Sequence, residues 1–270
     1  MGNAILAPSS PAAPALTPSA GDRPIRLVNE RFAVEALTVP PDTCGFLMLA
    51  AEVDWRGPLR RGGPVKRQLL VHARARCVDL AKRADVLEAT VFRAVLVAPG
   101  EGTDLIKARA GKVHHARYDV VILVRTSNVD AARALREEPD WVALADAVRR
   151  TARYTMEVVA RNAVRLGDVD HRRDDVFLFN YFYADDRATL LPVFAYTAGW
   201  FQAKTGLPNS TLLEPLEGEA TDNGIINHAS WPSFRTFLPS LIFRPTFRSF
   251  VLANFAANHV AAQPILYRRV

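Results

Sequence analysis

Cysteine is nearly absent from this 270-residue chain, which contains only Cys44 and Cys77. Their spacing fits neither a zinc-binding motif nor a disulfide framework. The sequence therefore excludes the small domains that depend on metal or disulfide cross-links. Both cysteines stand among small apolar residues, so we expect two reduced thiols buried in the core.

Long apolar runs are missing as well. No stretch approaches the ~18 residues of a membrane-spanning helix, and we expect no membrane partner. Residues 1–24 lack the basic segment and the continuous apolar segment of a secretory signal. Their composition of Pro, Ala and Ser cannot form a core and predicts a disordered tail. A cytoplasmic location is the resulting expectation.

Acidic residues are outnumbered, with 28 Asp and Glu against 34 Lys and Arg, for a formal net charge of +6. A basic excess suggests nucleic acid as a partner only when the charges cluster on one surface or segment. Here they are spread thinly, and we expect no nucleic-acid binding. The chain also lacks phosphate-binding glycine loops and the HExxH and GxSxG motifs, so we predict no metal site.

What the chain does have is a hydrophobic share of 49%, enough to bury a large core. From Gly45 onward, the periodicity predicts a strand, a helix opened by Pro64, two strands, a helix and a strand. The expected strands are Gly45–Trp55, Glu88–Pro99, Tyr118–Ser127 and Tyr154–Leu166, and the expected helices are Gly63–Val86 and Asn128–Arg153. This βαββαβ order is that of a ferredoxin-like unit.

After a polar linker over 167–175, the same order is repeated. The expected strands are Val176–Asp186, Ser210–Ala220, Gly224–Ser230 and Gln263–Val270, and the expected helices are Arg187–Gly206 and Pro232–Val260. We predict two units, 25–166 and 167–270, related by a diverged tandem duplication.

Strand Val176–Asp186 is apolar on both faces, since Phe177 and Phe179 alternate with Val176 and Leu178. A ferredoxin-like sheet carries helices on one face and needs cover on the other. Packing of sheet against sheet would supply that cover. The predicted fold class is therefore α+β, with two ferredoxin-like βαββαβ units in one chain forming a pseudo-dimeric α+β barrel.

The stretch "IINHASWPSFRTF" is the richest in polar and aromatic side chains. Alternation places Asn227 and Trp231 on one face of the strand and His228 on the other. Ser230 is predicted as the N-cap of the next helix, with Pro232 as its first residue. A cavity commonly opens where a helix leaves a strand, so Trp231 is a candidate cavity residue.

Three features resemble the antibiotic-biosynthesis-monooxygenase (ABM) group of the dimeric α+β barrel superfamily. They are Asn180 within "FLFNYF", Trp231 within "HASWPSF", and the helix sequence "FRTFLPSLIF". The order of elements matches from Gly45 to Val270, whereas the matching residues lie only in the second unit.

This resemblance implies a cavity between helices and sheet, where Asn180 and Trp231 act on an aromatic or polyketide-like substrate. One branch of the group oxidises such substrates with O2 and no cofactor, and this is the function we expect. Another branch binds haem through a histidine, but the matching position here is Phe247. A haem-binding or non-catalytic protein is the alternative.

Other residues could line the cavity of the second unit. Asn227 and Phe247 are candidates for substrate binding, and Arg235 or His228 could favour a phenolate. His259 is a further candidate. The two histidines also have purely structural interpretations. His228 could be a hydrogen-bonded histidine at the interface of the two units, and His259 could belong to a helix end.

Asn180 and Trp231 have structural readings too. A lone asparagine in an apolar strand is either paired with neighbouring backbone or kept for function. A tryptophan is often plain core. The first unit carries Leu49 where the second has Asn180, and Ser127 near the position of Trp231, so it is predicted to be structural. A homodimer is left open.

Overall fold

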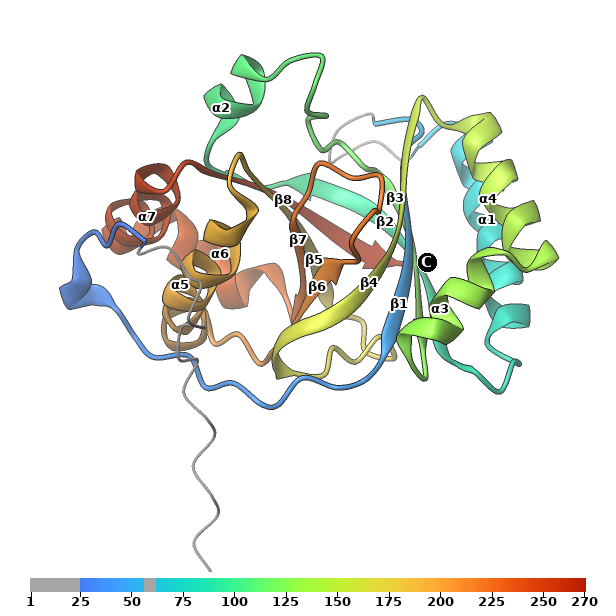
Figure 1. Cartoon of the computed structure of the whole chain (residues 1–270), viewed down its shortest axis with the longest axis horizontal. Helices are drawn as coiled ribbons and strands as arrows, with labels where there is room; N and C mark the ends of the chain where they lie inside the picture. Colours follow the sequence, from blue (N-terminus) through green and yellow to red (C-terminus); the bar gives the residue numbers. More distant parts are fainter. Residues whose placement is uncertain (1–24, 56–61) are drawn as a thin grey trace, which may run out of the picture.

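The computed structural model describes residues 25–55 and 62–270. Eight strands form one closed barrel in the order β1-β3-β2-β8-β5-β7-β6-β4, with helices at its two sides (Figure 1). All neighbouring strands are antiparallel. The tail predicted for residues 1–24 lies outside the described residues.

The first half of the barrel follows the predicted βαββαβ order, with one short helix that was not predicted between its second and third strands. Its strands are β1 (Gly45–Glu52), β2 (Val86–Val97), β3 (Val120–Thr126) and β4 (Tyr154–Gly167); its helices are α1 (Pro64–Leu80), α2 (Thr103–Ala108), α3 (Val129–Arg136) and α4 (Pro139–Thr151). Pro64 opens α1 as predicted. The expected second helix is divided into α3 and α4, because Glu138, next to Pro139, is held in an extended conformation.

The second half repeats the order. Its strands are β5 (Val176–Ala184), β6 (Asn209–Pro215), β7 (Ile225–Trp231) and β8 (Val260–Arg269); its helices are α5 (Leu190–Thr205), α6 (Phe234–Phe243) and α7 (Ala253–Ala257), with a π-helical turn at Phe247–Leu252. The single helix expected over 232–260 is interrupted after Phe243, where Arg244 is extended before Pro245.

The start of α6 also differs from the prediction. β7 pairs with β5 as far as Trp231, opposite Val176, so Ser230 belongs to the strand and cannot cap a helix. Ser233 is the N-cap residue, and the helix begins at Phe234 rather than Pro232.

The two half-sheets have matching strand orders, β4-β1-β3-β2 and β8-β5-β7-β6. They join at two seams, where β2 pairs with β8 and β4 pairs with β6. Each seam joins the second strand of one unit to the last strand of the other. This arrangement confirms the predicted pseudo-dimeric α+β barrel.

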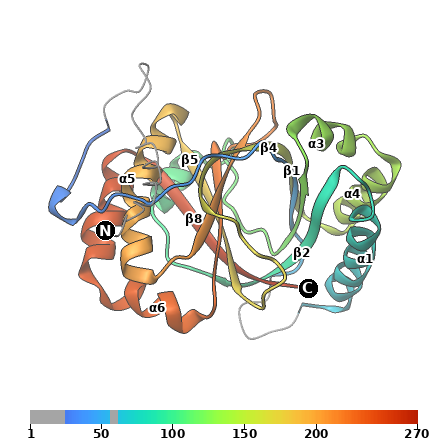
Figure 2. The ribbon, with the colours of Figure 1, turned by 90° about the horizontal axis from the view of Figure 1, so that it is seen from below.

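The barrel interior is a shared apolar core to which all eight strands contribute. It includes Phe46, Met48, Phe92, Val121, Leu123, Val158, Phe177, Phe179, Tyr181, Leu213, Ile226, Ile265 and Tyr267. The hydroxyl of Tyr267 donates to the carbonyl oxygen of Tyr118 at 2.7 Å. Outside the barrel, α1, α3 and α4 form one helical layer, and α5 and α6 lie on the opposite side (Figure 2).

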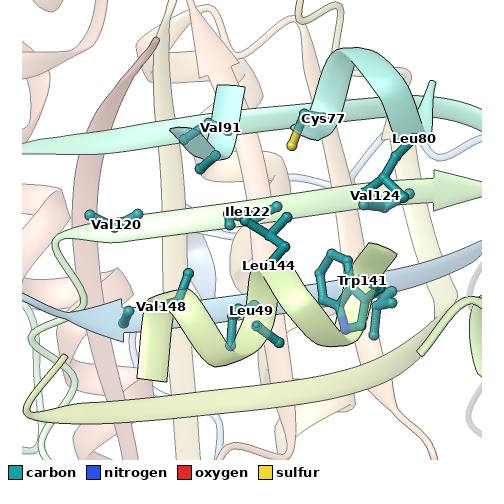
Figure 3. Close-up of a cluster of buried hydrophobic side chains, with 14 of the residues drawn as sticks. Leu49, Cys77, Leu80, Val91, Val120, Ile122, Val124, Trp141, Leu144 and Val148 are labelled. Atoms are coloured by element: carbon teal, nitrogen blue, oxygen red, sulfur yellow. The ribbon is translucent and has the colours of Figure 1, made fainter. Parts of the chain in front are cut away.

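In the first half, side chains fill the space between helices and sheet. Leu49 of β1 and Ile122 of β3 are opposite each other and are almost fully buried. Trp141, Leu144 and Val148 of α4 belong to the same cluster (Figure 3). These five apolar side chains leave this face of the first sheet without a polar group at its centre.

Residues 25–37 lie against the helices of the second half. Three amide side chains hold this segment. Each of them accepts from the backbone N–H and donates to the carbonyl oxygen of a single residue. Gln202 binds Leu37, Asn254 binds Val28 and Asn258 binds Arg26. The amides thus satisfy backbone groups that no strand pairs.

Among the described residues, no helix is long and apolar enough to cross a membrane.

Two buried histidines are in contact with each other. His228 of β7 stacks on Phe179 with ring centroids 4.1 Å apart, and its Nδ1 donates to the carbonyl oxygen of Leu178 at 3.0 Å. In the neutral ring Nε2 is therefore unprotonated, and it lies 2.7 Å from Nε2 of His171. Desolvation, followed by the nearby His171, holds the pKa of His228 well below its usual range.

This depressed pKa predicts that acid destabilises the fold. In the unfolded chain the pKa of a histidine is about 6.5. Below that pH the unfolded chain binds a proton that folded His228 resists. The free energy of unfolding should then fall by up to about 1.4 kcal/mol per pH unit, whereas the full contribution is present above about pH 6.5. Urea denaturation between about pH 7.5 and about pH 5 measures this loss.

The matched variants are His228→Phe and His72→Gln, because His72 is exposed on α1. His228→Phe should show a smaller loss of stability on acidification, and His72→Gln should behave as the wild type. Equal pH dependence in the wild type and His228→Phe would contradict the assignment.

Candidate functional site

A cavity lies between the sheet and the helices of the second half. It contains about 630 Å³ of empty space, a volume that includes the open mouth and the solvent in it. Its lining is Pro99, Gly100, Leu166, Leu178, Asn180, Phe182, Phe194, Thr197, Ala198, Phe201, Leu207, Asn227, Trp231, Phe247, Leu252, Phe255, Ala262 and Pro264. The wall is apolar except at a few positions.

The helical wall follows from helix periodicity and from one irregularity. Phe194, Thr197, Ala198 and Phe201 of α5 recur at the spacing of one helix face. The hydroxyl of Thr197 is bonded back to the carbonyl oxygen of Val193 at 2.9 Å, so it adds little polarity. Across the cavity, the π-helical turn contributes Phe247 and Leu252. Such turns are frequent at functional sites.

Two asparagines stand side by side on the sheet. Asn180 of β5 is directly opposite Asn227 of β7, and residues so paired have Cβ atoms about 4.5–5.5 Å apart. Both side chains line the cavity, and Asn180 is 9% exposed. Its Oδ1 atom is buried without a hydrogen-bond partner among the described residues. An unpaired buried oxygen costs about 1–3 kcal/mol, so this amide is suited to a ligand.

Trp231 lies at the end of β7 and belongs, with the two asparagines, to the sheet side of the cavity, which we call its floor. Its Nε1 donates to Oγ1 of Thr205 at 3.2 Å, and its ring stacks on Phe237 with centroids 4.5 Å apart. Because the N–H group is already bonded, Trp231 offers a ligand its ring rather than a hydrogen bond.

The described residues of the first half show none of these features at the matching positions. Leu49 is opposite Ile122 in the same register that places Asn180 opposite Asn227. Thr126 takes the position of Trp231. It lies opposite Gly45, the first residue of β1, just as Trp231 lies opposite Val176, the first residue of β5. The sequence comparison assigned Ser127 to this position, one residue too far, because it could not detect the strand register.

The structure brings together four of the seven predicted site residues: Asn180, Asn227, Trp231 and Phe247. The other three lie elsewhere. His228 points into the barrel by strand alternation. Arg235 is exposed, since α6 turns Phe237 inward instead.

His259, the third of these residues, follows α7 with a left-handed backbone of φ 51°. It lines a separate surface pocket with Glu101 and Asp104. His228, Arg235 and His259 are therefore not among the residues that line the main cavity.

The first half nevertheless contributes to the cavity. Leu166 from the end of β4 and Pro99 and Gly100 beyond β2 form part of the wall. Gly100 lies so close to β8 that a Cβ atom there would be 2.1 Å from the carbonyl oxygen of Ala262. No local pattern marked these residues, because they reach the cavity only through the seams of the barrel.

The lining contains no acid, base or thiol among the described residues. It therefore offers a ligand two amides, one indole ring and an apolar wall. Elsewhere in the described part of the chain, no three His, Cys, Asp or Glu side chains are placed to hold a metal ion.

No protein-family profile matches the sequence, and no curated protein sequence is significantly similar. Among solved structures, an anthrone oxidase-like protein has a TM-score of 0.62 at 13% identity, over 85% of this chain and 92% of its own. A putative monooxygenase from Fusobacterium nucleatum subsp. nucleatum has a TM-score of 0.47 at 7% identity, over 84% and 93%.

A dye-decolorizing peroxidase from Bacteroides thetaiotaomicron has a TM-score of 0.46 at 9% identity, over 87% of this chain and 96% of its own. The TM-scores of the peroxidase and the monooxygenase are both below 0.5, so neither similarity establishes a shared fold. The likeness to the anthrone oxidase-like protein concerns the fold alone: this chain shares its architecture, a closed α+β barrel of two ferredoxin-like halves.

Proposed function

We propose that this protein is an oxygenase that binds an aromatic, polyketide-like substrate in the cavity of its second half and oxidises it with O2. The observation that carries the proposal is the pair Asn180 and Asn227 on the floor of an otherwise apolar cavity, with Oδ1 of Asn180 unpaired. A structure with the same fold is named anthrone oxidase-like. This name guides the choice of an anthrone as test substrate.

The reaction is balanced without a further reactant. An anthrone ionises at the methylene group between its rings, and the resulting anion is rich in electrons. A C–O bond forms at this carbon, both C–H bonds are lost, and O2 is the oxidant. One anthrone and one O2 give one anthraquinone and one water.

The side chains of the cavity would bind and orient the substrate rather than transfer its proton. An amide N–H donor stabilises an oxygen that gains negative charge on ionisation of the ring. The face of Trp231 and the phenylalanines hold the rings, and their apolar surface keeps water out. Since the described lining has no base, the substrate must be acidic enough to ionise on its own or through water.

The haem alternative does not fit the residues of the cavity. Haem iron is held by His, Cys, Met or Tyr side chains, and none of these is among the described lining residues. Phe247 is in the wall where the haem-binding branch of the ABM group would carry its histidine. The proposed reaction therefore includes no haem.

A second candidate is a protein that binds an aromatic ligand without transforming it. The specific observation in its favour is the same lack of an acid or base in the described lining. Catalytic turnover distinguishes the two candidates, because binding alone consumes no O2.

The variant Asn180→Leu gives this position the residue of the first half, Leu49. We expect O2 uptake with 9-anthrone to fall at least about tenfold, because the cavity loses one of the two amides that orient the substrate. Stability should rise by about 1 kcal/mol, since the unpaired buried oxygen is removed. An oxygen electrode and urea denaturation measure the two effects, with the rate of 9-anthrone oxidation without protein subtracted.

The matched control is Asn209→Leu. Asn209 is also buried in the second half, but its Oδ1 accepts from the backbone N–H of Ser230 at 2.9 Å. This variant should lose stability. If the wild type does not accelerate O2 uptake, the oxygenase proposal is wrong. Binding of 9-anthrone without turnover would then support the second candidate.

Haem titration gives an independent prediction. We expect hemin to produce no one-to-one Soret change with the wild type, because the cavity offers no iron ligand. Phe247→His places an imidazole in the wall, and one-to-one binding is expected for this variant. A stoichiometric Soret band in the wild type would overturn the cofactor-free reading.

A further inference from the structure

A serine outside the cavity is bonded to one of its two asparagines. Ser210 of β6 is 1% exposed and is not among the lining residues. Its hydroxyl donates to Oδ1 of Asn227. Ser210 is opposite Ala229 on the neighbouring strand, so it reaches Asn227 diagonally, from the side away from β5.

This bond determines which part of the Asn227 amide is left for a ligand. An asparagine side chain has one acceptor oxygen and an NH2 group with two donors. In Asn227 the oxygen is engaged by Ser210, which leaves the NH2 group. In Asn180, directly opposite, the acceptor Oδ1 is buried without a hydrogen-bond partner among the described residues. The floor therefore presents a donor on β7 beside an acceptor on β5.

We infer that Ser210 is a positioning residue that keeps the Asn227 amide oriented as a hydrogen-bond donor toward the ligand. The inference rests on the proposed function only in taking this cavity as the ligand site. Without the serine hydroxyl, no other hydrogen bond among the described residues fixes the orientation of the Asn227 amide, and its oxygen and its NH2 group become exchangeable.

The fixed orientation of the Asn227 amide limits the class of ligand that fits the cavity. A donor at Asn227 selects an oxygen that only accepts, such as a ring ketone or phenolate. An acceptor at Asn180 selects a hydroxyl that donates. Because the two asparagines are direct neighbours, these groups must be close together on one face of the ligand. A hydroxylated aromatic ketone meets both conditions, whereas a plain hydrocarbon meets neither.

Two probes of similar shape test the donor directly. 2-Acetonaphthone carries a ketone oxygen, and 2-ethylnaphthalene does not. We expect the full-length wild type to bind the ketone more tightly by roughly 3- to 10-fold, the effect of one net hydrogen bond. In Ser210→Ala this ratio should fall toward one, while the affinity for 2-ethylnaphthalene stays unchanged. Quenching of tryptophan fluorescence measures both dissociation constants.

Two further variants separate positioning from damage to the fold. Ser210→Thr retains the hydroxyl and should keep the ketone preference. Thr211→Val removes a buried hydroxyl from the opposite face of the same strand and should also keep it. The inference is overturned if the wild type shows no ketone preference, if Ser210→Ala retains it, or if Ser210→Ala loses affinity for both probes alike. All of these are binding measurements. Absence of O2 uptake would therefore contradict the oxygenase proposal and leave the role of Ser210 unaffected.

Discussion

The structure depends on the pairing of two half-sheets along their edges. Each ferredoxin-like half has a sheet whose inner face is apolar, and neither half alone could cover that face. Where β2 joins β8 and β4 joins β6, the sheet closes and no strand edge is left in the barrel. Phe92, Phe179 and Tyr267 are then enclosed from both sides. Burial of apolar surface in this closed interior stabilises the fold by about 25 cal/mol per Å².

Closure also frees the outer faces to differ. In the first half, Leu49 and Ile122 lie beneath Trp141 and Leu144, and the space is filled. The second half places Asn180 where the first has Leu49, and an unpaired oxygen remains on a cavity floor. A fold rarely keeps such a cost without a role for it. The barrel thus combines one half whose helices pack closely on the sheet with one half that retains a polar, open surface.

Prediction from sequence succeeded where a period of two or of 3.6 residues decides the outcome. The strands, their faces and the placement of Trp231 and Asn227 on one side all follow from such periods. It failed at Arg235 and His259, whose directions depend on where α6 begins and on how α7 ends. It also missed Ser210, because a diagonal contact between strands leaves no signal in the spacing of either strand.

The sequence by itself determined the α+β class, the repeated βαββαβ order and the unusual asparagine in an apolar strand, because each is a property of local pattern and residue type. Only the tertiary structure decided that Asn180 faces Asn227, that Leu166 and Pro99 complete the cavity, and that His228 is sealed inside the barrel. These relations depend on strand register and on the seams between halves. Both are set by packing between residues far apart in the chain.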